Sequence, residues 1–180
     1  MRAATFTAPR DGSPVTVLDD AGLRITAFAV DHSPVVPAVG YRFDYAGRSL
    51  VISGDTVKSS AVEAQADGVD LLVHEGLAPH LVQILTDAAA ASGQVIAERI
   101  TRDILDYHTS PVEAAEIAAA AKAKALLFYH IVPPLRLPGM QAAFLRGVSD
   151  VYSGKVVVPR DGTCASLPAG TSEVRFSELL

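Results

Sequence analysis

Residues 108–130 read HTSPVEAAEIAAAAKAKALLFYH, and this stretch decides how the rest of the chain is interpreted. Its third to sixth residues, SPVE, form a capping box with proline at the first helical position, so a helix is expected to begin there. The alanine-rich run suits that helix, and ALLFYH at 125–130 suits a buried strand. The stretch therefore predicts a helix followed by a strand, with His108 and His130 at its two ends.

Upstream of this unit, the sequence predicts hairpins that give way to alternating helices and strands. Alternating apolar residues and tight turns indicate four strands in two hairpins: VTVL (15–18), RITAFAV (24–30), YRFDY (41–45) and RSLVISG (48–54). A short helix over 58–66 and a buried strand, VDLLVHEG at 69–76, come next. Apolar residues at helical spacing then predict helices over 78–93 and 94–107.

After residue 130, a helix is expected near Met140 to Val151, followed by the strands KVVVP (155–159) and TCASL (163–167) around an Asp161-Gly162 turn. Hairpins in the first half and helix–strand alternation in the second predict an α/β or α+β layered domain with a mixed sheet. With 180 residues, the chain is expected to form a single domain over 1–180.

The composition is that of a globular protein, with 49% hydrophobic and 19% charged residues. The formal charge is −5 and the 15 lysines and arginines are scattered, which disfavours binding to a nucleic-acid backbone. The single cysteine, Cys164, excludes an intrachain disulfide and a cysteine-rich zinc site. Residues 1–12 hold no apolar run of signal-peptide length, so a cytoplasmic protein without a membrane partner is expected.

Four predicted strands end in polar residues: Asp31-His32, Gly54-Asp55, His74-Glu75 and His130. Side chains just beyond adjacent strand ends can converge on one rim of a sheet. Imidazole and carboxylate are ligands of zinc, iron(II) and manganese, so His32, Asp55 and His130 are candidate metal ligands. Taken singly, each has an ordinary alternative: a histidine at a strand end is commonly a surface residue, and Gly54-Asp55-Thr56 can be a turn that caps a helix.

Taken together, the segments resemble the C-terminal half of the metallo-β-lactamase superfamily. The matching pieces are VDHSPVVPAVGYRF, LVISGDT, DLLVHEG and YHTSPVEAAEIAAAAKAKALLFYHIVPP, in the family's order and over roughly residues 15–167. They are most similar to the ribonuclease Z and arylsulfatase-like phosphodiesterase branch. The resemblance implies an αββα sandwich that binds two metal ions. Zinc is the expected ion, with manganese and iron(II) as alternatives. His32 would complete the first site, Asp55 would bridge, and His130 would complete the second.

The resemblance also implies separate roles for the two histidines that bound residues 108–130. His130 would hold a metal, while His108, in the HTS motif, would act on the substrate as a general acid or oxyanion partner. The segment HEGL resembles a motif in which the glutamate orients that histidine, so Glu75 is expected to contact His108, and His74 is expected to be structural. The alternatives are that Glu75 caps a helix and that His108 is a turn residue.

The superfamily's HxHxDH signature is absent, since no two histidines lie two residues apart. The chain is therefore expected to be inactive alone and to form a homo-oligomer or to associate with a missing N-terminal half. The alternative is a non-catalytic half-domain that acts as a binding or assembly subunit. Residues 33–54 leave no room for the RNA-gripping arm of ribonuclease Z, which favours a small-molecule ester or phosphodiester over transfer RNA as substrate.

Overall fold

The computed structural model describes residues 5–8 and 13–179, so much of the segment on which the signal-peptide expectation rests lies outside the described residues. Within them, the main sheet contains seven strands in chain order: β1 (Val15–Asp20), β2 (Leu23–Ala29), β3 (Val39–Tyr45), β4 (Arg48–Ile52), β5 (Leu71–Leu77), β6 (Ala125–Val132) and β7 (Lys155–Val157). A smaller sheet pairs β8 (Thr163–Ser166) with β9 (Arg175–Glu178).

The main sheet changes direction at β4, and this confirms the predicted mixed sheet. Strands β1 to β4 are antiparallel neighbours, whereas β4, β5, β6 and β7 run parallel. Both predicted hairpins form, and their turns use left-handed residues, Ala21-Gly22 and Ala46-Gly47, as two-residue hairpin loops require. The parallel strands need helical crossovers, which brings their carboxyl ends to one edge of the sheet.

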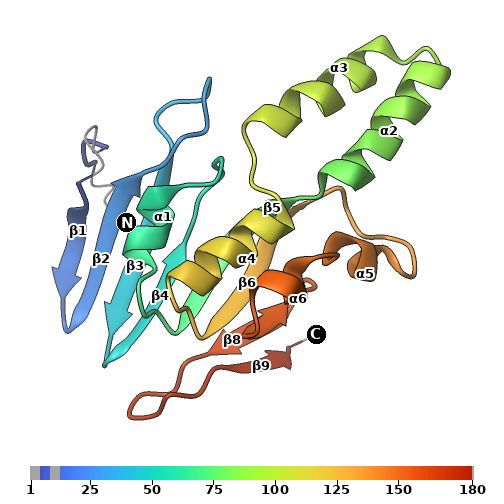
Figure 1. Ribbon diagram of the computed structural model, residues 1–180. Coiled ribbons are helices and arrows are strands. Elements are labelled where there is room, and N and C mark those ends of the chain that lie inside the picture. The colour runs from blue at the N-terminus through green and yellow to red at the C-terminus, as the bar shows by residue number, and fades with distance from the viewer. Residues whose placement is uncertain (1–4, 9–12, 180) are drawn as a thin grey trace.

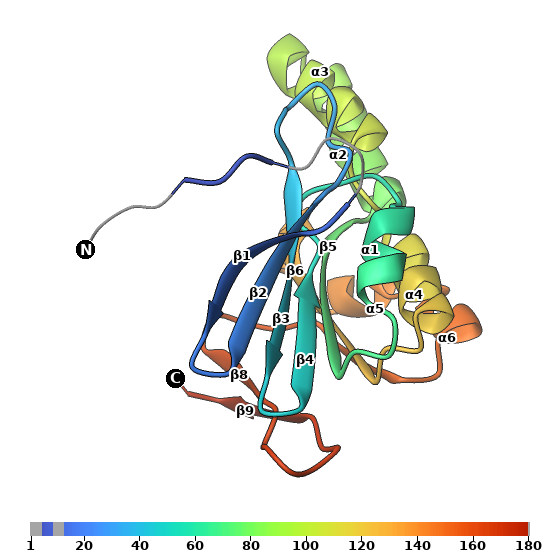
Figure 2. The ribbon, with the colours of Figure 1, turned by 90° about the vertical axis from the view of Figure 1, so that its left-hand side faces the viewer.

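Helices cover one face of this sheet. They are α1 (Ser60–Gln65), α2 (Pro79–Ala91), α3 (Val95–Asp103), α4 (Pro111–Ala120), α5 (Met140–Phe144) and α6 (Val148–Val151), with a 3₁₀ turn η1 (Ile104–Asp106) after α3. In Figures 1 and 2, α1, α4 and α6 lie along the same side of the sheet, while α2 and α3 project beyond its edge as a helical pair. The capping box predicted for α4 is present: the Ser110 hydroxyl accepts from the backbone of Glu113, whose side chain accepts from Ser110.

The core fills the space between the sheet and these helices. Phe28, Val51, Leu72, Leu126 and Phe128 are completely buried and meet the small side chains of α4. Alanine at most buried α4 positions lets the helix approach the sheet closely, so the bulky residues come from the strands.

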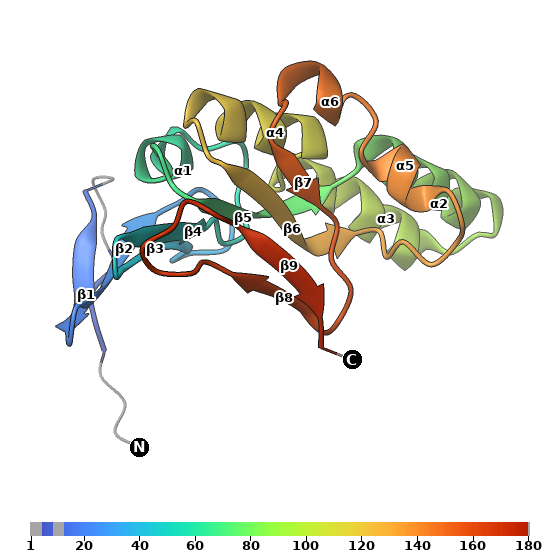
Figure 3. The same cartoon turned by 90° about the horizontal axis from the view of Figure 1, so that it is seen from below.

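The opposite face of the sheet is apolar and only partly covered. Tyr41, Phe43, Leu50 and Ile52 are half-buried there, on the side away from α4. Figure 3 shows the β8–β9 hairpin on this second side, with α1, α4 and α6 on the first. One sheet with helices on one face is the arrangement expected for half of an αββα sandwich.

The C-terminal region differs in detail from the sequence prediction. The helix expected near Met140 to Val151 is two short helices, because Gly147 between them has a left-handed φ of 86°. The strand from 155 joins the main sheet, whereas the strand from 163 pairs with β9, which the sequence did not predict. In the described part of the chain, no helix is both long and apolar enough to span a bilayer.

Candidate metal and catalytic site

Polar side chains from five separate segments meet at the carboxyl edge of the parallel strands. His32 follows β2, Asp55 follows β4, and His108 precedes α4. Glu75 and His130 were predicted to stand at strand ends, but β5 continues to Leu77 and β6 to Val132. They reach the rim from inside the strands, at a point where the β5–β6 register shifts between Glu75 and Gly76.

Asp55 and His130 approach each other as two ligands of one ion would. The distance between Asp55 Oδ2 and His130 Nε2 is 3.7 Å, and both side chains are partly exposed. This distance is long for a hydrogen bond. It is near the roughly 3.4 Å that separates two ligands of a tetrahedral zinc ion with bonds of about 2.0–2.1 Å.

The backbone of His130 is unusual, with φ at 43°. Left-handed backbone is uncommon for residues other than glycine, although asparagine, aspartate and histidine adopt it more often than the rest, and it costs about 1–3 kcal/mol when the surroundings enforce it. The register shift beside His130 accommodates this conformation and aims the imidazole at Asp55.

His32 is oriented by a backbone contact that the sequence did not reveal. Its Nδ1 lies 2.9 Å from the Tyr107 carbonyl oxygen, so Nδ1 carries the proton and Nε2 is left with a lone pair for a metal. The Tyr107 ring also meets the His32 ring edge-on at 5.1 Å between centroids. The His108 ring lies between the other two imidazoles, with its centroid 5.0 Å from that of His32 and 5.3 Å from that of His130.

Glu75 and His108 form a buried pair, in the contact that the sequence resemblance implied. His108 Nδ1 lies 3.0 Å from Glu75 Oε1, and the glutamate side chain is completely buried. The same oxygen accepts the backbone N–H groups of Thr109 at 3.0 Å and Thr56 at 3.2 Å. One carboxylate therefore fixes the turn before α4, the loop after β4, and the His108 imidazole.

This environment changes how readily His108 holds a proton. Burial alone would lower the pKa of His108, but the hydrogen bond to Glu75 and the negative charges of Glu75 and Asp55 outweigh it and raise the pKa. A raised pKa keeps the imidazolium present at higher pH, which suits a proton donor.

His74 leaves β5 on the other side from Glu75, because consecutive strand residues point to opposite faces. It is completely buried, its Nδ1 lies 2.9 Å from the Glu75 carbonyl oxygen, and its Nε2 has no hydrogen-bond partner. Burial lowers the pKa of His74, so it is neutral. The structure thus directs His74 away from the rim, where His32, His108 and His130 meet.

The donor atoms at the rim fit a divalent metal. Ligand atoms of Glu75, His108 and His130 all lie within 4.8 Å of one another in the described structure. His32 and Asp55 add an imidazole and a carboxylate at the same edge. Nitrogen and oxygen donors of this kind suit zinc, manganese and iron(II). Two assignments are open: His108 stands beside the metal, as the sequence predicted, or it joins His130 as a ligand.

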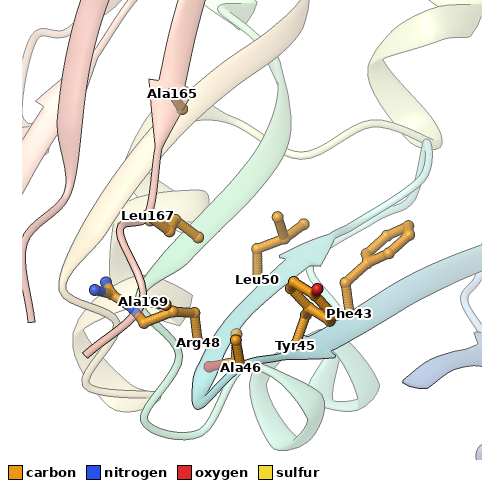
Figure 4. Close-up of a pocket in the computed structure, with 9 residues that line it drawn as sticks. Phe43, Tyr45, Ala46, Arg48, Leu50, Ala165, Leu167 and Ala169 are labelled. Atoms are coloured by element: carbon orange, nitrogen blue, oxygen red, sulfur yellow. The ribbon is translucent and has the colours of Figure 1, made fainter. Parts of the chain in front are cut away.

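A pocket of about 360 Å³ lies at the opposite end of β4. Figure 4 shows Phe43, Tyr45 and Leu50 on its sheet side and Leu167 on the segment after β8. Its lining is mostly apolar and contains none of the rim residues.

A mixed sheet with helices on one face, and with imidazoles and carboxylates at its carboxyl edge, is the arrangement of one half of a metallo-β-lactamase fold. A family model described as "Beta-lactamase superfamily domain" matches residues 3–131, and the chain belongs to this family.

Curated relatives are named ribonuclease Z. The protein from Mycobacterium sp. (strain KMS) is 33% identical over 160 residues, covering 84% of this chain and 52% of the relative. That from Mycobacterium tuberculosis (strain ATCC 25618 / H37Rv) is 33% identical over 143 residues, covering 79% and 48%. The chain spans about half the length of the curated relatives it matches.

Two solved structures share the fold. The metallo-beta-lactamase fold protein YhfI from Bacillus subtilis aligns with a TM-score of 0.56 and 19% identity, covering 83% of this chain and 51% of that protein. Igni18, a metallo hydrolase from Ignicoccus hospitalis KIN4/I, aligns with a TM-score of 0.51 and 15% identity, covering 96% and 60%.

The sequence did not identify several residues at the rim. Tyr107 acts through its carbonyl, and Thr56 and Thr109 act through their amides, groups that every such residue carries. The signal for Tyr107 and Thr109 was their position on either side of His108 in the YHTS segment.

Proposed function

We propose that this chain is the ligand-bearing second half of a metal-dependent hydrolase of ester or phosphodiester bonds. The observation that carries the proposal is the meeting of two pairs at one rim: Asp55 with His130 at 3.7 Å, and Glu75 with His108 at 3.0 Å. The first pair has the spacing of metal ligands, and the second has the geometry of a carboxylate-oriented acid.

In this proposal His32, Asp55 and His130 hold the metal. Zinc is the first candidate, and manganese and iron(II) suit the same donors. When bound, such ions lower the pKa of water and neutralise developing negative charge. The hydrogen bond from His32 to the Tyr107 carbonyl fixes the imidazole so that its other nitrogen faces an ion.

His108 serves the scissile step through its own proton. Glu75 holds Nδ1, so Nε2 is the nitrogen that can donate to the leaving oxygen or to an oxyanion. The raised pKa of His108 favours the protonated form that this role needs. Glu75 also ties down both loops that flank the site, which limits movement of His108 during the reaction.

The substrate class follows from charge and from the relatives. The name ribonuclease Z carried by the relatives supports a phosphodiester. The net charge of −5 and the short segment 33–54, which is largely taken up by β3 and β4, favour a small ester or phosphodiester over transfer RNA.

The remaining ligands are proposed to come from a second half, whether another segment, another chain or another copy. Support comes from the half-length match to the curated relatives and from the partly uncovered apolar sheet face. A non-catalytic binding subunit is the second candidate, favoured by the absence of the HxHxDH pattern in the sequence.

Zinc and manganese titrations of the 180-residue chain, followed by calorimetry, test the proposal. Binding is expected, and His130→Ala should weaken it about 10-fold or more because a ligand is lost. His80→Ala is the matched control, since His80 contacts the Ala143 carbonyl outside the rim. Absence of metal binding by the unsubstituted chain would overturn the metal site and favour the binding subunit.

A further inference from the structure

Another cavity lies where β6 and β7 end, and we call it the arginine cavity. It has a volume of about 580 Å³ and is lined by Ile131 on β6 and by residues within 135–141 and 158–160. Because β6 and β7 are parallel neighbours, their carboxyl ends meet at one edge of the sheet, where ligands of parallel sheets usually bind. The arginine cavity thus has the place and the size of a small-molecule site.

The charge of this lining is opposite to that of the molecule as a whole. Its polar side chains are those of Arg136, Gln141 and Arg160, and no aspartate or glutamate of the described residues lines it. The whole chain carries 20 aspartates and glutamates against 15 lysines and arginines. A concave lining with two arginines and no carboxylate attracts anions in an otherwise acidic protein.

Neither guanidinium has a carboxylate partner within the described structure. Six of the nine arginines in the described residues form ion pairs with carboxylates, namely Arg24, Arg42, Arg48, Arg99, Arg102 and Arg175. The other three are Arg136, Arg146 and Arg160, and Arg160 forms no ion pair even though Asp161 follows it in the chain. Two of the three arginines without a carboxylate partner therefore line one cavity.

Both arginines stand on backbone that is held in place. The Arg160 amide donates to the Thr163 hydroxyl at 3.0 Å, and its carbonyl accepts from the Thr163 amide at 2.9 Å. The Arg136 amide donates to the Pro134 carbonyl at 3.1 Å. An anion that binds here therefore has to order two exposed side chains but does not have to reorganise these turns.

The arginines favour phosphate, and the rest of the lining favours an organic body attached to it. A phosphate monoester has three strong acceptor oxygens, so it can accept from two guanidinium groups at once. An apolar wall completes the arginine cavity, formed by Ile131, Leu135, Leu137, Val158 and Pro159. Guanidinium groups also stack on aromatic rings. A phosphate ion alone leaves this wall in contact with water.

We propose that the arginine cavity is a binding site for a phosphate monoester with an apolar or aromatic body. Arg136 and Arg160 hold the phosphate, and the apolar wall contacts the body. The inference goes beyond the proposed function and does not depend on it, because none of the proposed metal ligands lines the arginine cavity.

Calorimetric titration of the 180-residue chain with phenyl phosphate and with inorganic phosphate, both in the presence of EDTA, tests the inference. EDTA removes metal ions, so that phosphate binding to an ion at the rim does not contribute. We expect phenyl phosphate to bind about 10-fold more tightly than inorganic phosphate or better, because its ring removes the apolar wall from water.

Arg136→Gln and Arg160→Gln should each weaken the binding of phenyl phosphate about 10-fold, since each removes charge-assisted hydrogen bonds. Arg146→Gln is the matched control: it removes the same charge from an arginine that is also exposed and unpaired but does not line the arginine cavity. Its affinity for phenyl phosphate should stay unchanged. All three substitutions lie at exposed positions, so the thermal midpoint should change little.

The possible results separate this inference from the proposed metal site. Absence of phenyl phosphate binding by the unsubstituted chain would overturn the arginine cavity as a site and leave the metal site untouched. Equal weakening by Arg146→Gln would show a general attraction to positive charge and would also overturn it. Equal affinities for the two probes would assign the arginine cavity to free phosphate and overturn the monoester.

Discussion

The two ends of the parallel strands β4, β5 and β6 carry charged clusters of opposite character. At the amino ends, Asp70 accepts from Arg48 Nε at 2.9 Å, from Lys124 Nζ at 2.7 Å and from the Ser49 backbone at 2.9 Å. At the carboxyl ends, the buried Glu75 keeps one oxygen without a hydrogen-bond partner. Both carboxylate oxygens of Asp70 have hydrogen-bond partners, whereas Glu75 at the rim keeps an oxygen without one.

The cluster around Asp70 serves stability, whereas the rim around Glu75 serves chemistry. Buried polar groups in folded proteins are nearly all paired, and an unpaired one is costly unless something binds it. In the described part of the chain, the buried side-chain atoms without a hydrogen-bond partner are His74 Nε2 and Glu75 Oε2, on consecutive residues of β5, and only Glu75 faces the rim. In proteins with parallel sheets, ligands bind at the carboxyl ends of the strands, which is where Glu75 keeps an oxygen without a partner.

The largest expected effect comes from substituting His108, in the cluster at the carboxyl ends of the strands. In a preparation that hydrolyses a phosphodiester, His108→Ala should lower kcat by about 10²–10⁴-fold, because the step loses its general acid, while metal content stays intact. A nitrophenyl ester should suffer less than an ester with a poor leaving group, since its leaving oxygen needs little protonation. Steady-state kinetics and metal analysis of the same sample provide the measurement.

His130→Ala serves as the comparison for that variant and should lose metal and activity together. If His108→Ala lost metal to the same degree, His108 would be a ligand and the alternative set of Glu75, His108 and His130 would be the correct one. If His108→Ala kept full activity on a poor leaving group, His108 would be a turn residue.

The next largest effect is expected from substituting Asp70, in the cluster at the amino ends of the strands. Asp70→Ala leaves the guanidinium of Arg48 buried without its carboxylate, with both side chains only 6% exposed in the native pair. Removing one partner of a buried ion pair costs about 3–5 kcal/mol. Urea unfolding should report this loss, and zinc affinity of the folded fraction should be unchanged. A loss under 1 kcal/mol would show that water replaces the carboxylate.

The contribution of the Arg48–Asp70 pair should also be visible in how the stability of the unsubstituted chain falls at acid pH. Burial alone would raise the pKa of Asp70, but hydrogen bonds from Lys124, Arg48 and Ser49 outweigh it and hold the pKa below its usual 3.8. A depressed pKa in the folded state stabilises the fold above about pH 4, and this contribution disappears as the pH falls through the folded value. Asp70→Ala should therefore flatten the acid limb of the stability curve.

The smallest effect is expected from substituting Lys124, in the same cluster around Asp70. Lys124 also bonds to Asp70, but its side chain is 47% exposed. Lys124→Met should cost at most about 1 kcal/mol, the usual range for an exposed ion pair, and 1 M salt should lower the stability of the unsubstituted chain by no more than that. A cost comparable to that of Asp70→Ala would mean that Lys124, rather than Arg48, neutralises the carboxylate.

Local signals in the sequence predicted most of the elements, but not strand β9 or the break between α5 and α6. The hairpins and the start of α4 were predicted because their determinants, Ala46-Gly47 and Ser110 to Glu113, lie within a few residues of one another. Strand β9 was missed because its four residues are mostly exposed and gain their structure from pairing with β8. The break at Gly147 was missed because a single glycine does not by itself end a helix.

At the rim, the sequence identified which residue types meet but not how they are held. His32, Asp55, Glu75, His108 and His130 do gather at one edge, as their order in the chain indicated. The positions of Glu75 and His130 within β5 and β6 were not predicted, because the register shift between these strands and the left-handed backbone of His130 cannot be read from the residue types. The backbone partners of His32 and Glu75 were equally invisible, because any residue could supply them.

Arg48 also connects the first sheet to residues far along the chain. Besides Asp70, its guanidinium donates to the backbone carbonyls of Pro168, Thr171 and Glu173. A segment between β8 and β9 that would otherwise be a free loop is thus fastened to the start of β4. Cleavage by a protease within 168–173 requires this clasp to open, so resistance to proteolysis at that segment reports whether the central sheet is folded.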